Sequence, residues 1–164
     1  MDSFSFNDSS VQVNGTVIIS NVLDATIMRS SFQNNTLAGQ WSSSGIPPDD
    51  IIGCCRSGGV HVFNSSLRIY LSVFSDNVGY ITGGVYGVNS NITITESIFS
   101  RNRGFQAETY CVDRLNDGNA GALFVSSGTL QVLNGNFSNN IGSTQSGAVF
   151  FEHLKLLEIT GSTF

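Results

Sequence analysis

The chain carries little charge, and most of that charge is negative. Its 164 residues include 7 Lys and Arg and 12 Asp and Glu, which gives a net charge of -5 at neutral pH. The basic residues are scattered along the sequence, so the clustered positive patch that marks a nucleic-acid-binding protein is missing. We therefore expect no nucleic acid among its partners.

Long apolar runs are also missing. No stretch approaches the roughly 18 consecutive apolar residues that cross a bilayer, and residues 1–10, MDSFSFNDSS, lack the basic and apolar regions of a signal peptide. We therefore expect no direct membrane span. The chain does contain N-x-Ser/Thr sequons, slightly more than its composition supplies by chance, and these favour an extracellular or cell-surface location. The candidate N-glycosylation sites are Asn7, Asn14, Asn34, Asn64, Asn91 and Asn136.

The abundant residues are glycine, with 18 copies, and Ser, Thr and Asn, which separate short runs of Val, Ile, Leu and Phe. This composition is typical of a β-rich protein with many turns. A chain of this length is long enough to form one domain with a substantial core.

Five segments of the chain share one pattern that ends in Phe. An apolar residue seven positions before the Phe and another five positions before it flank a polar residue. Such alternation predicts a β-strand with one face buried. The first apolar row is Ala25, Leu67, Ile92, Leu130 and Leu157; the second is Ile27, Ile69, Ile94, Val132 and Ile159; the polar row is Thr26, Arg68, Thr93, Gln131 and Glu158.

The Phe itself is preceded, two positions earlier, by a small residue, and in four segments an Asn follows three positions later. If equivalent strands stack in register about 4.8 Å apart, the rings form one interior ladder and the Asn amides form another. Asn suits such a row because its side chain both donates and accepts hydrogen bonds. The predicted structural ladder comprises Phe32, Phe74, Phe99, Phe137 and Phe164 together with Asn35, Asn77, Asn102 and Asn140.

A second landmark precedes four of the five Phe residues. It is a glycine at the start of another apolar strand. We expect glycine at this position because the chain turns there and the Cβ atom of any other residue would clash. These glycines are Gly59, Gly84, Gly121 and Gly147. Alignment on them makes His61, Tyr86, Leu123 and Val149 equivalent, and likewise Val62, Gly87, Phe124 and Phe150. Both faces of this strand are then apolar, so either a neighbouring chain covers one of them or the interior is thick.

These spacings predict an all-β parallel β-helix (solenoid) of about five to six coils, with 25–28 residues per coil. Residues 1–164 form a single solenoid segment. Two insertions, residues 37–57 and 103–119, fall between an Asn and the next glycine and are expected to project from one edge. FSFN at residues 4–7 is interpreted as the tail of a coil. No polar cap is evident at either end, so we expect part of a longer chain or assembly.

The paired motifs F-x-x-N and G-G-A-[ILV] resemble the repeats of the chlamydial polymorphic outer membrane proteins and their surface relatives. F-x-x-N occurs at Phe4, Phe32, Phe74, Phe99 and Phe137, and the glycine motif is matched in part at residues 58–60, 83–85, 121–123 and 147–149. The resemblance implies a right-handed parallel β-helix exposed at a cell surface, with an adhesive or structural role.

Cysteine is scarce, with three residues in the chain. Cys54 and Cys55 lie in the first insertion and Cys111 in the second. A disulfide from Cys55, or from Cys54, to Cys111 is one interpretation, and three free thiols is the other. No C-x-x-C or neighbouring His completes a metal site.

The candidate catalytic groups are carboxylates and histidines. Asp49, Asp50, Asp113 and Asp117 lie in the insertions, where paired carboxylates can bind calcium or do acid–base chemistry, but Asp is also common in turns. His61 and His153 have no nucleophile at a suitable spacing and are interpreted as structural.

We therefore expect a noncatalytic extracellular or cell-surface protein with a structural, adhesive or assembly role. Its expected partners are other protein chains, a continuation of the same solenoid, or glycans, and no catalytic residue, cofactor or metal is assigned. The alternative is a carbohydrate-active β-helix enzyme, similar to pectate lyases and related polysaccharide hydrolases.

Overall fold

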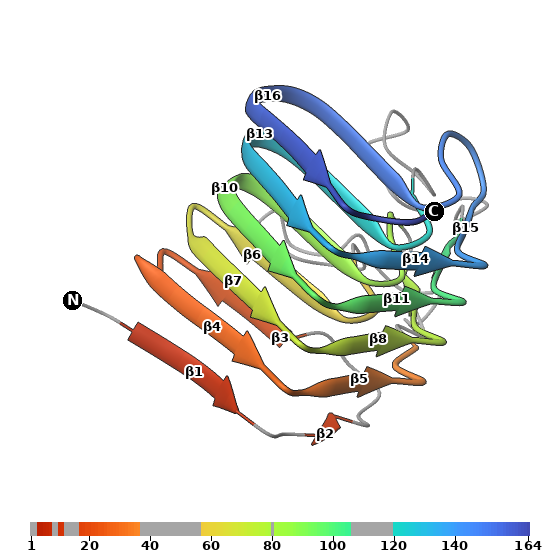
Figure 1. The fold of residues 1–164 in the computed structure, drawn as a ribbon, viewed down its shortest axis with the longest axis horizontal. Coiled ribbons are helices and arrows are strands. Elements are labelled where there is room, and N and C mark those ends of the chain that lie inside the picture. Colours follow the sequence, from red (N-terminus) through yellow and green to blue (C-terminus); the bar gives the residue numbers. More distant parts are fainter. Residues whose placement is uncertain (1–2, 8–9, 12–16, 37–56, 80, 106–119) are drawn as a thin grey trace, which may run out of the picture.

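The computed structural model describes residues 3–7, 10–11, 17–36, 57–79, 81–105 and 120–164. Within these ranges the protein is all-β, without a helix, and its strands form three sheets in which every pairing between named strands is parallel. Figure 1 shows the strands as successive parallel arrows, with β1 and β16 at opposite ends of the stack.

The first sheet is the largest. It contains β1 (Ser3–Asn7), β3 (Val17–Ser20), β4 (Asp24–Met28), β6 (Val60–Phe63), β7 (Ser66–Tyr70), β10 (Val85–Thr95), β13 (Leu123–Leu133) and β16 (Val149–Thr160). The second contains β2 (Ser10–Val11), β5 (Ser31–Gln33), β8 (Val73–Ser75), β11 (Ile98–Ser100) and β14 (Asn136–Ser138). The third contains β9 (Val78–Gly79), β12 (Arg103–Gly104) and β15 (Ile141–Gly142).

The chain visits these sheets in a fixed order. After β10 in the first sheet it forms β11 in the second and β12 in the third, and it then returns to the first sheet as β13. We call each such set of strands a level. Successive levels are therefore stacked. A level contributes to the first sheet either one long strand, such as β10, or two short ones, such as β6 and β7, and it contributes one short strand to each of the other sheets that it reaches.

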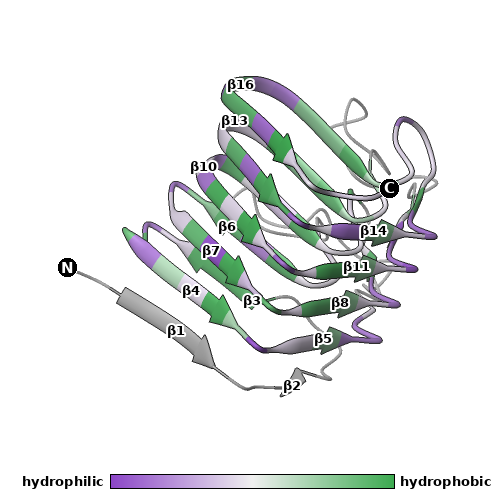
Figure 2. Cartoon of the chain, viewed as in Figure 1, coloured by the Kyte–Doolittle hydropathy of each residue, from purple (hydrophilic) through white to green (hydrophobic). Residues whose placement is uncertain are grey.

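The predicted rows of equivalent residues are observed. Ile92 of β10 pairs in register with Leu67 of β7 and Leu130 of β13, and Ile94 pairs with Ile69 and Val132. These side chains are buried, whereas the residue between them, such as Arg68 in β7, is outside. Hydrophobic and hydrophilic bands consequently alternate along the coloured strands of the first sheet, such as β7, β10 and β13 (Figure 2).

Each level bends at three corners where one residue has left-handed backbone angles. Its backbone N–H still donates to a carbonyl of the adjacent level, as Leu71 does to Thr95 at 3.1 Å, so the bend is held by inter-level hydrogen bonds. Asn tolerates this conformation better than most residues, and it is the most frequent choice. The non-glycine corner residues are Asn21, Asn64, Asn89, Ser127 and His153 at the first corner; Arg29, Leu71, Glu96 and Asn134 at the second; and Asn34, Asp76, Arg101 and Asn139 at the third.

The small residue that follows the second corner has a role beyond its size. The Ser97 Oγ atom accepts a hydrogen bond from the backbone N–H of Ser72 in the adjacent level at 3.1 Å and donates to the Thr95 carbonyl at 2.9 Å. Ser72 repeats this arrangement with Ser30. The hydroxyl therefore satisfies a buried backbone donor that the bend leaves without a strand partner.

Ser97→Ala is expected to lower the free energy of unfolding by about 1–3 kcal/mol, because it leaves the buried Ser72 N–H without its acceptor. Ser100→Ala is the matched control, since the half-buried Ser100 hydroxyl makes no hydrogen bond in the described part of the chain. Chemical denaturation of both variants measures the difference, and equal stabilities would contradict the role assigned to Ser97.

The interpretation of FSFN as the tail of a coil is wrong. β1 pairs with β4 so that Phe4 is in register with Ala25 and Phe6 with Ile27, which makes this segment a first strand. Val11 in β2 is the residue in register with Phe32. The reason is the period-2 alternation of SFSFN, which fits a strand, and the seven-residue step from Phe4 to Val11, which matches that from Ala25 to Phe32.

The alignment on Gly59, Gly84, Gly121 and Gly147 is wrong by one residue in the last two levels. Val85 pairs with Val60 and Leu123, and Leu123 pairs with Val149, so Gly84 is equivalent to Ala122 rather than to Gly121. The aliphatic residue that starts each strand sets the register, because it must face the interior. Tight packing at the glycines is confirmed at Gly121, where a Cβ atom would lie 2.1 Å from the Gly147 carbonyl oxygen.

The third sheet was not predicted. Arg103 and Gly104, placed in the second insertion by the sequence, instead form β12, and Ser57 of the first insertion bridges to Thr82. The signal was the N-x-G triplet that follows three of the Phe residues, Phe74, Phe99 and Phe137. Glycine is required there because a Cβ atom at Gly104 would lie 2.3 Å from the Ala120 carbonyl oxygen. Residues 37–56 and 106–119 lie outside the described ranges.

Candidate functional site

The asparagine ladder is a continuous row of side-chain amides at the third corner. Asn77 Nδ2 donates both to Asn102 Oδ1 and to the Phe32 carbonyl, each at 2.9 Å. Asn102 repeats the arrangement toward Asn140 and the Phe74 carbonyl at 3.1 and 2.8 Å. Each Oδ1 also accepts from a backbone N–H, as Asn102 Oδ1 does from Asn77 at 3.2 Å. These amides use their hydrogen-bonding capacity on one another, so the row is structural.

The phenylalanine ladder lies in the interior next to that row. Its rings are nearly parallel, with centroid separations of 4.7 Å for Phe32–Phe74, 4.8 Å for Phe74–Phe99, 5.0 Å for Phe99–Phe137 and 5.0 Å for Phe137–Phe164. The first four rings are buried and the last is 65% exposed. The stack therefore continues to the last level, where one ring face is uncovered.

A second aromatic row lies on the opposite face of the first sheet. Tyr86 and Phe124 are in register and stacked at 5.0 Å, and His61 meets Tyr86 edge to face at 4.8 Å. All three are at most 3% exposed, and Tyr86 and Phe124 belong, with Ile81, to a cluster separate from the main core. The glycine-based alignment had placed Tyr86 beside Leu123, so it missed this row.

The described outer surface carries two inter-level ion pairs. The Arg101 guanidinium donates to both Asp76 carboxylate oxygens at 2.7 Å, and Arg68 contacts Asp24 in the same manner. The hydrogen bond from Arg101 lowers the pKa of Asp76, opposed by partial desolvation. Both pairs join neighbouring levels at exposed positions, where ion pairs contribute little to stability.

Asp76→Asn tests this pair. Because the folded-state pKa of Asp76 lies below its unfolded value, the stabilisation is present above the unfolded pKa of about 3.9 and is lost as pH falls through the lower folded value. When the pH falls through that window, we expect the free energy of unfolding of the wild type to decrease slightly more than that of Asp76→Asn. Near neutral pH we expect the free energy of unfolding to vary with pH in the same way in both proteins. Denaturation curves at several pH values measure this, and identical acid profiles would contradict it.

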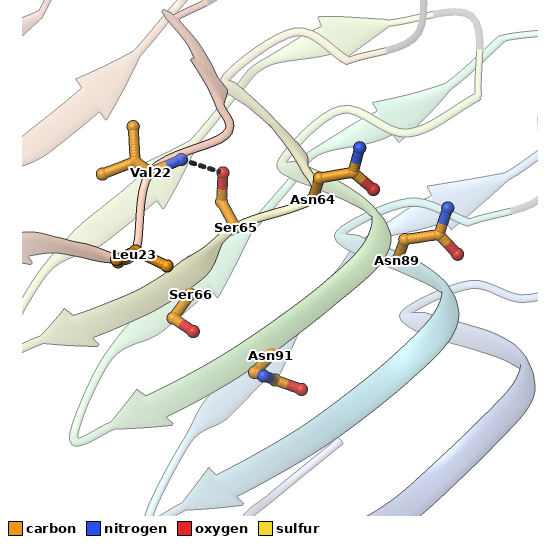
Figure 3. A pocket seen from close by; sticks show the side chains of 7 residues that line it. All are labelled: Val22, Leu23, Asn64, Ser65, Ser66, Asn89 and Asn91. Atoms are coloured by element: carbon orange, nitrogen blue, oxygen red, sulfur yellow. Dashed lines mark hydrogen bonds between the residues drawn. The ribbon is translucent and has the colours of Figure 1, made fainter. Parts of the chain in front are cut away.

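One open pocket lies at the first corner (Figure 3). It forms where four residues of one level, 21–24, lie opposite three residues of the next level, 64–66. The segment that contains Val22 is therefore one residue longer than the segment that it faces. Ser65 Oγ accepts from the Val22 N–H at 2.9 Å, which closes the base of the pocket. Its lining consists of Val22, Leu23, Asn64, Ser65, Ser66, Asn89 and Asn91. The amides and hydroxyls offer hydrogen bonds and the exposed Leu23 offers an apolar contact, but the lining side chains include no acid or base.

The two histidines lie in different surroundings. His61 is buried in the second aromatic row, whereas His153 is an exposed corner residue of β16. Cys54, Cys55 and Cys111, and the carboxylates Asp49, Asp50, Asp113 and Asp117, lie outside the described residues. The part of the chain that is described contains no group of His, Cys, Asp and Glu able to hold a metal ion.

Four sequons have an asparagine whose side chain is described, and each of these side chains is exposed. Asn34 and Asn64 are corner residues, Asn91 lies midway along β10, and Asn136 starts β14. Asn7 ends β1, with its side chain outside the description, and Asn14 lies outside the described residues. No ladder asparagine is the acceptor of a sequon, although Asn35 is the middle residue of the sequon that begins at Asn34.

The edge formed by β16 is open in the described structure. β16 pairs with β13 on one side, and no described strand lies on the other. Leu157 and Ile159 are 39% and 38% exposed, whereas the equivalent Leu130 and Val132 of the preceding level are fully buried. An apolar surface with unpaired backbone groups is therefore presented at this end.

No described segment forms a helix long and apolar enough to cross a membrane. Comparisons with protein-family models, curated proteins and solved structures find no match for this chain. Its function must therefore be inferred from its own residues.

Proposed function

We propose that the chain is a segment of a noncatalytic extracellular or cell-surface β-solenoid with a structural, adhesive or assembly role. In this proposal the stacked levels are coils of a right-handed parallel β-helix, about five to six in number, of 25–28 residues each without insertions. The observation that carries the proposal is the asparagine ladder, in which polar groups of successive levels saturate one another. Residues used in this way build a long rigid body rather than a reaction centre.

The open edge of β16 supports an assembly role. In the preceding levels whose side chains are described, the inward apolar residues and the backbone groups are covered by the next level, whereas the last level leaves inward apolar residues 38–65% exposed, namely Phe151, Leu157, Ile159 and Phe164. We infer that another coil with the same inward pattern packs on this edge, because a strand of any other pattern would leave these side chains or the backbone groups unmatched. The uncovered edge is otherwise prone to uncontrolled pairing.

Amide hydrogen exchange of the native, full-length protein tests this inference. If a further coil covers the edge, the amides of β16 should exchange about as slowly as those of β13 in the preceding level. Ile159→Lys should then be strongly destabilising, while Glu158→Lys, at the neighbouring outward position, should have little effect. Fast exchange across β16 in native material, with Ile159→Lys tolerated, would contradict the assembly role.

Incubation with pectin-like and other acidic glycans tests the noncatalytic part of the proposal. We expect neither new reducing ends nor unsaturated products, with or without added calcium. Sustained turnover by the purified protein would contradict the proposal and would direct attention to the carboxylates at Asp49, Asp50, Asp113 and Asp117.

A further inference from the structure

The chain contains two chemically different populations of asparagine. In the interior ladder, Asn77 Nδ2 donates one hydrogen to Asn102 and the other to the Phe32 carbonyl, and Asn102 Nδ2 is used in the same manner. Both N–H hydrogens are consumed and both residues are fully buried. An N-linked sugar replaces one of these hydrogens, so a ladder asparagine could carry one only if the row were broken.

The sequon asparagines are in the opposite situation. Within the described structure the exposed side chains of Asn34 and Asn136 make no hydrogen bond. Asn91 accepts from Thr129 Oγ1 at 3.0 Å through its Oδ1 atom, which leaves the Nδ2 atom available. Asn64 Nδ2 lies 3.5 Å from Asn21 Oδ1, at the outer limit of a hydrogen bond, and Figure 3 shows its side chain at the rim of the pocket.

The folded levels also have room for a substituent at these places. Asn34 and Asn64 are at corners, where the side chain points away from the sheets, and Asn91 and Asn136 are at outward strand positions that alternate with the buried Ile92 and Phe137. The hydroxyl residue that completes each sequon is also at least partly accessible. These hydroxyl residues are Thr36, Ser66, Thr93 and Ser138.

We propose that Asn34, Asn64, Asn91 and Asn136 carry N-linked glycans in the native protein, while the ladder asparagines remain unmodified. This inference rests on the proposed extracellular location, because the donor is a lipid-diphosphate-linked oligosaccharide of the secretory route. In the transfer, asparagine Nδ2 forms a bond to C1 of the first sugar, the C1–O bond to the diphosphate breaks, and one Nδ2 proton is lost as the lipid diphosphate departs.

The position of the acceptors has a structural consequence. Ser66 pairs in register with Asn91, so the glycans on Asn64 and Asn91 would emerge from adjacent levels at the first corner and would flank the pocket. Neither 37–56 nor 106–119 contains a sequon. The sugars on Asn64 and Asn91 would therefore cover the outside of the first corner, and residues 37–56 and 106–119 would carry no N-linked sugar.

Peptide mapping of protein purified from its native source tests the proposal. Enzymatic deglycosylation in heavy-oxygen water converts each glycosylated asparagine into labelled aspartate, and we expect the label at the four sequons and none at Asn35, Asn77 and Asn102. Unmodified asparagine at all four positions in native protein would overturn the inference. If the four asparagines were unmodified and β16 were still protected from exchange in the same material, the glycan inference would fail and the proposed assembly role would stand.

Matched variants of the full chain secreted from a eukaryotic host test each acceptor. Asn64→Gln and Ser66→Ala should each remove one glycan mass, whereas Asn89→Gln, which changes an exposed corner asparagine outside any sequon, should leave the mass unchanged. The glycosylated protein should keep the unfolding midpoint of enzymatically deglycosylated protein to within a few degrees. A large loss of stability upon glycosylation at these sites would contradict the accommodation argued above.

Discussion

Replacing Asn102 with alanine is expected to lower the free energy of unfolding by about 3–6 kcal/mol, which is a large part of the roughly 5–15 kcal/mol of a typical domain. The change removes four hydrogen bonds: two that its Oδ1 accepts from Asn77 and two that its Nδ2 donates to Asn140 and the Phe74 carbonyl. The Asn77 backbone N–H is then buried without an acceptor. Chemical denaturation of the purified variant measures the loss.

Asn102→Asp separates hydrogen bonding from packing. The side chain keeps its shape, but an oxygen replaces Nδ2 and faces two acceptors, so we expect a loss at least as large as for alanine. Asn136→Ala is the matched control, because that exposed side chain makes no hydrogen bond in the described structure and should change stability by less than about 0.5 kcal/mol. If Asn102→Ala were as mild as Asn136→Ala, the ladder would have no structural role.

Phe99→Ala should be about as damaging, with an expected loss of about 3–5 kcal/mol. Phe99 is completely buried between Phe74 at 4.8 Å and Phe137 at 5.0 Å, so truncation removes both stacking contacts and leaves a cavity in the middle of the column. Phe99→Leu should recover part of the loss because it refills much of the volume. Thermal and chemical unfolding of the three proteins measure the series.

Ile98→Ala controls for position, since Ile98 precedes Phe99 in β11 and is 43% exposed on the outer face. We expect it to cost less than about 1 kcal/mol. The double variant Phe74→Ala/Phe99→Ala should lose less free energy of unfolding than the two single variants lose together. The reason is that each single variant already removes the contact between these two rings. Equal effects of Phe99→Ala and Ile98→Ala would contradict the inward assignment of the phenylalanine row.

The strands and the interior rows could be predicted because identical side chains recur at identical offsets. Ala25, Ile27 and Phe32 have their counterparts in each later segment, and parallel in-register pairing follows directly when like residues stack on like. The asparagine row could be predicted for the same reason. Its second set of hydrogen bonds, from Nδ2 to the Phe carbonyls, could not, because it depends on the exact geometry of the corner.

The errors arose where the motif was short or ambiguous. F-x-x-N fits the sequence at Phe4, and this match suggested the tail of a coil. The alternation of Phe4 and Phe6 with polar residues instead indicates a first strand, and β1 pairs with β4 accordingly. Runs of two small residues, such as Gly121–Ala122, allowed a one-residue slip, and a slip of one residue exchanges the two faces of a strand. That exchange concealed the second aromatic row. The two-residue strands of the third sheet are too short to show any period.

Nuclear Overhauser effects between selectively labelled phenylalanine rings test the central claim, that equivalent residues of successive levels stack in register along one axis. The account predicts contacts from Phe74 to Phe99 and from Phe99 to Phe137. It predicts none from Phe74 to Phe137, because these rings are two levels, and therefore about 9.8 Å, apart. Direct contacts between Phe74 and Phe137, or rings without any phenylalanine neighbour, would contradict it.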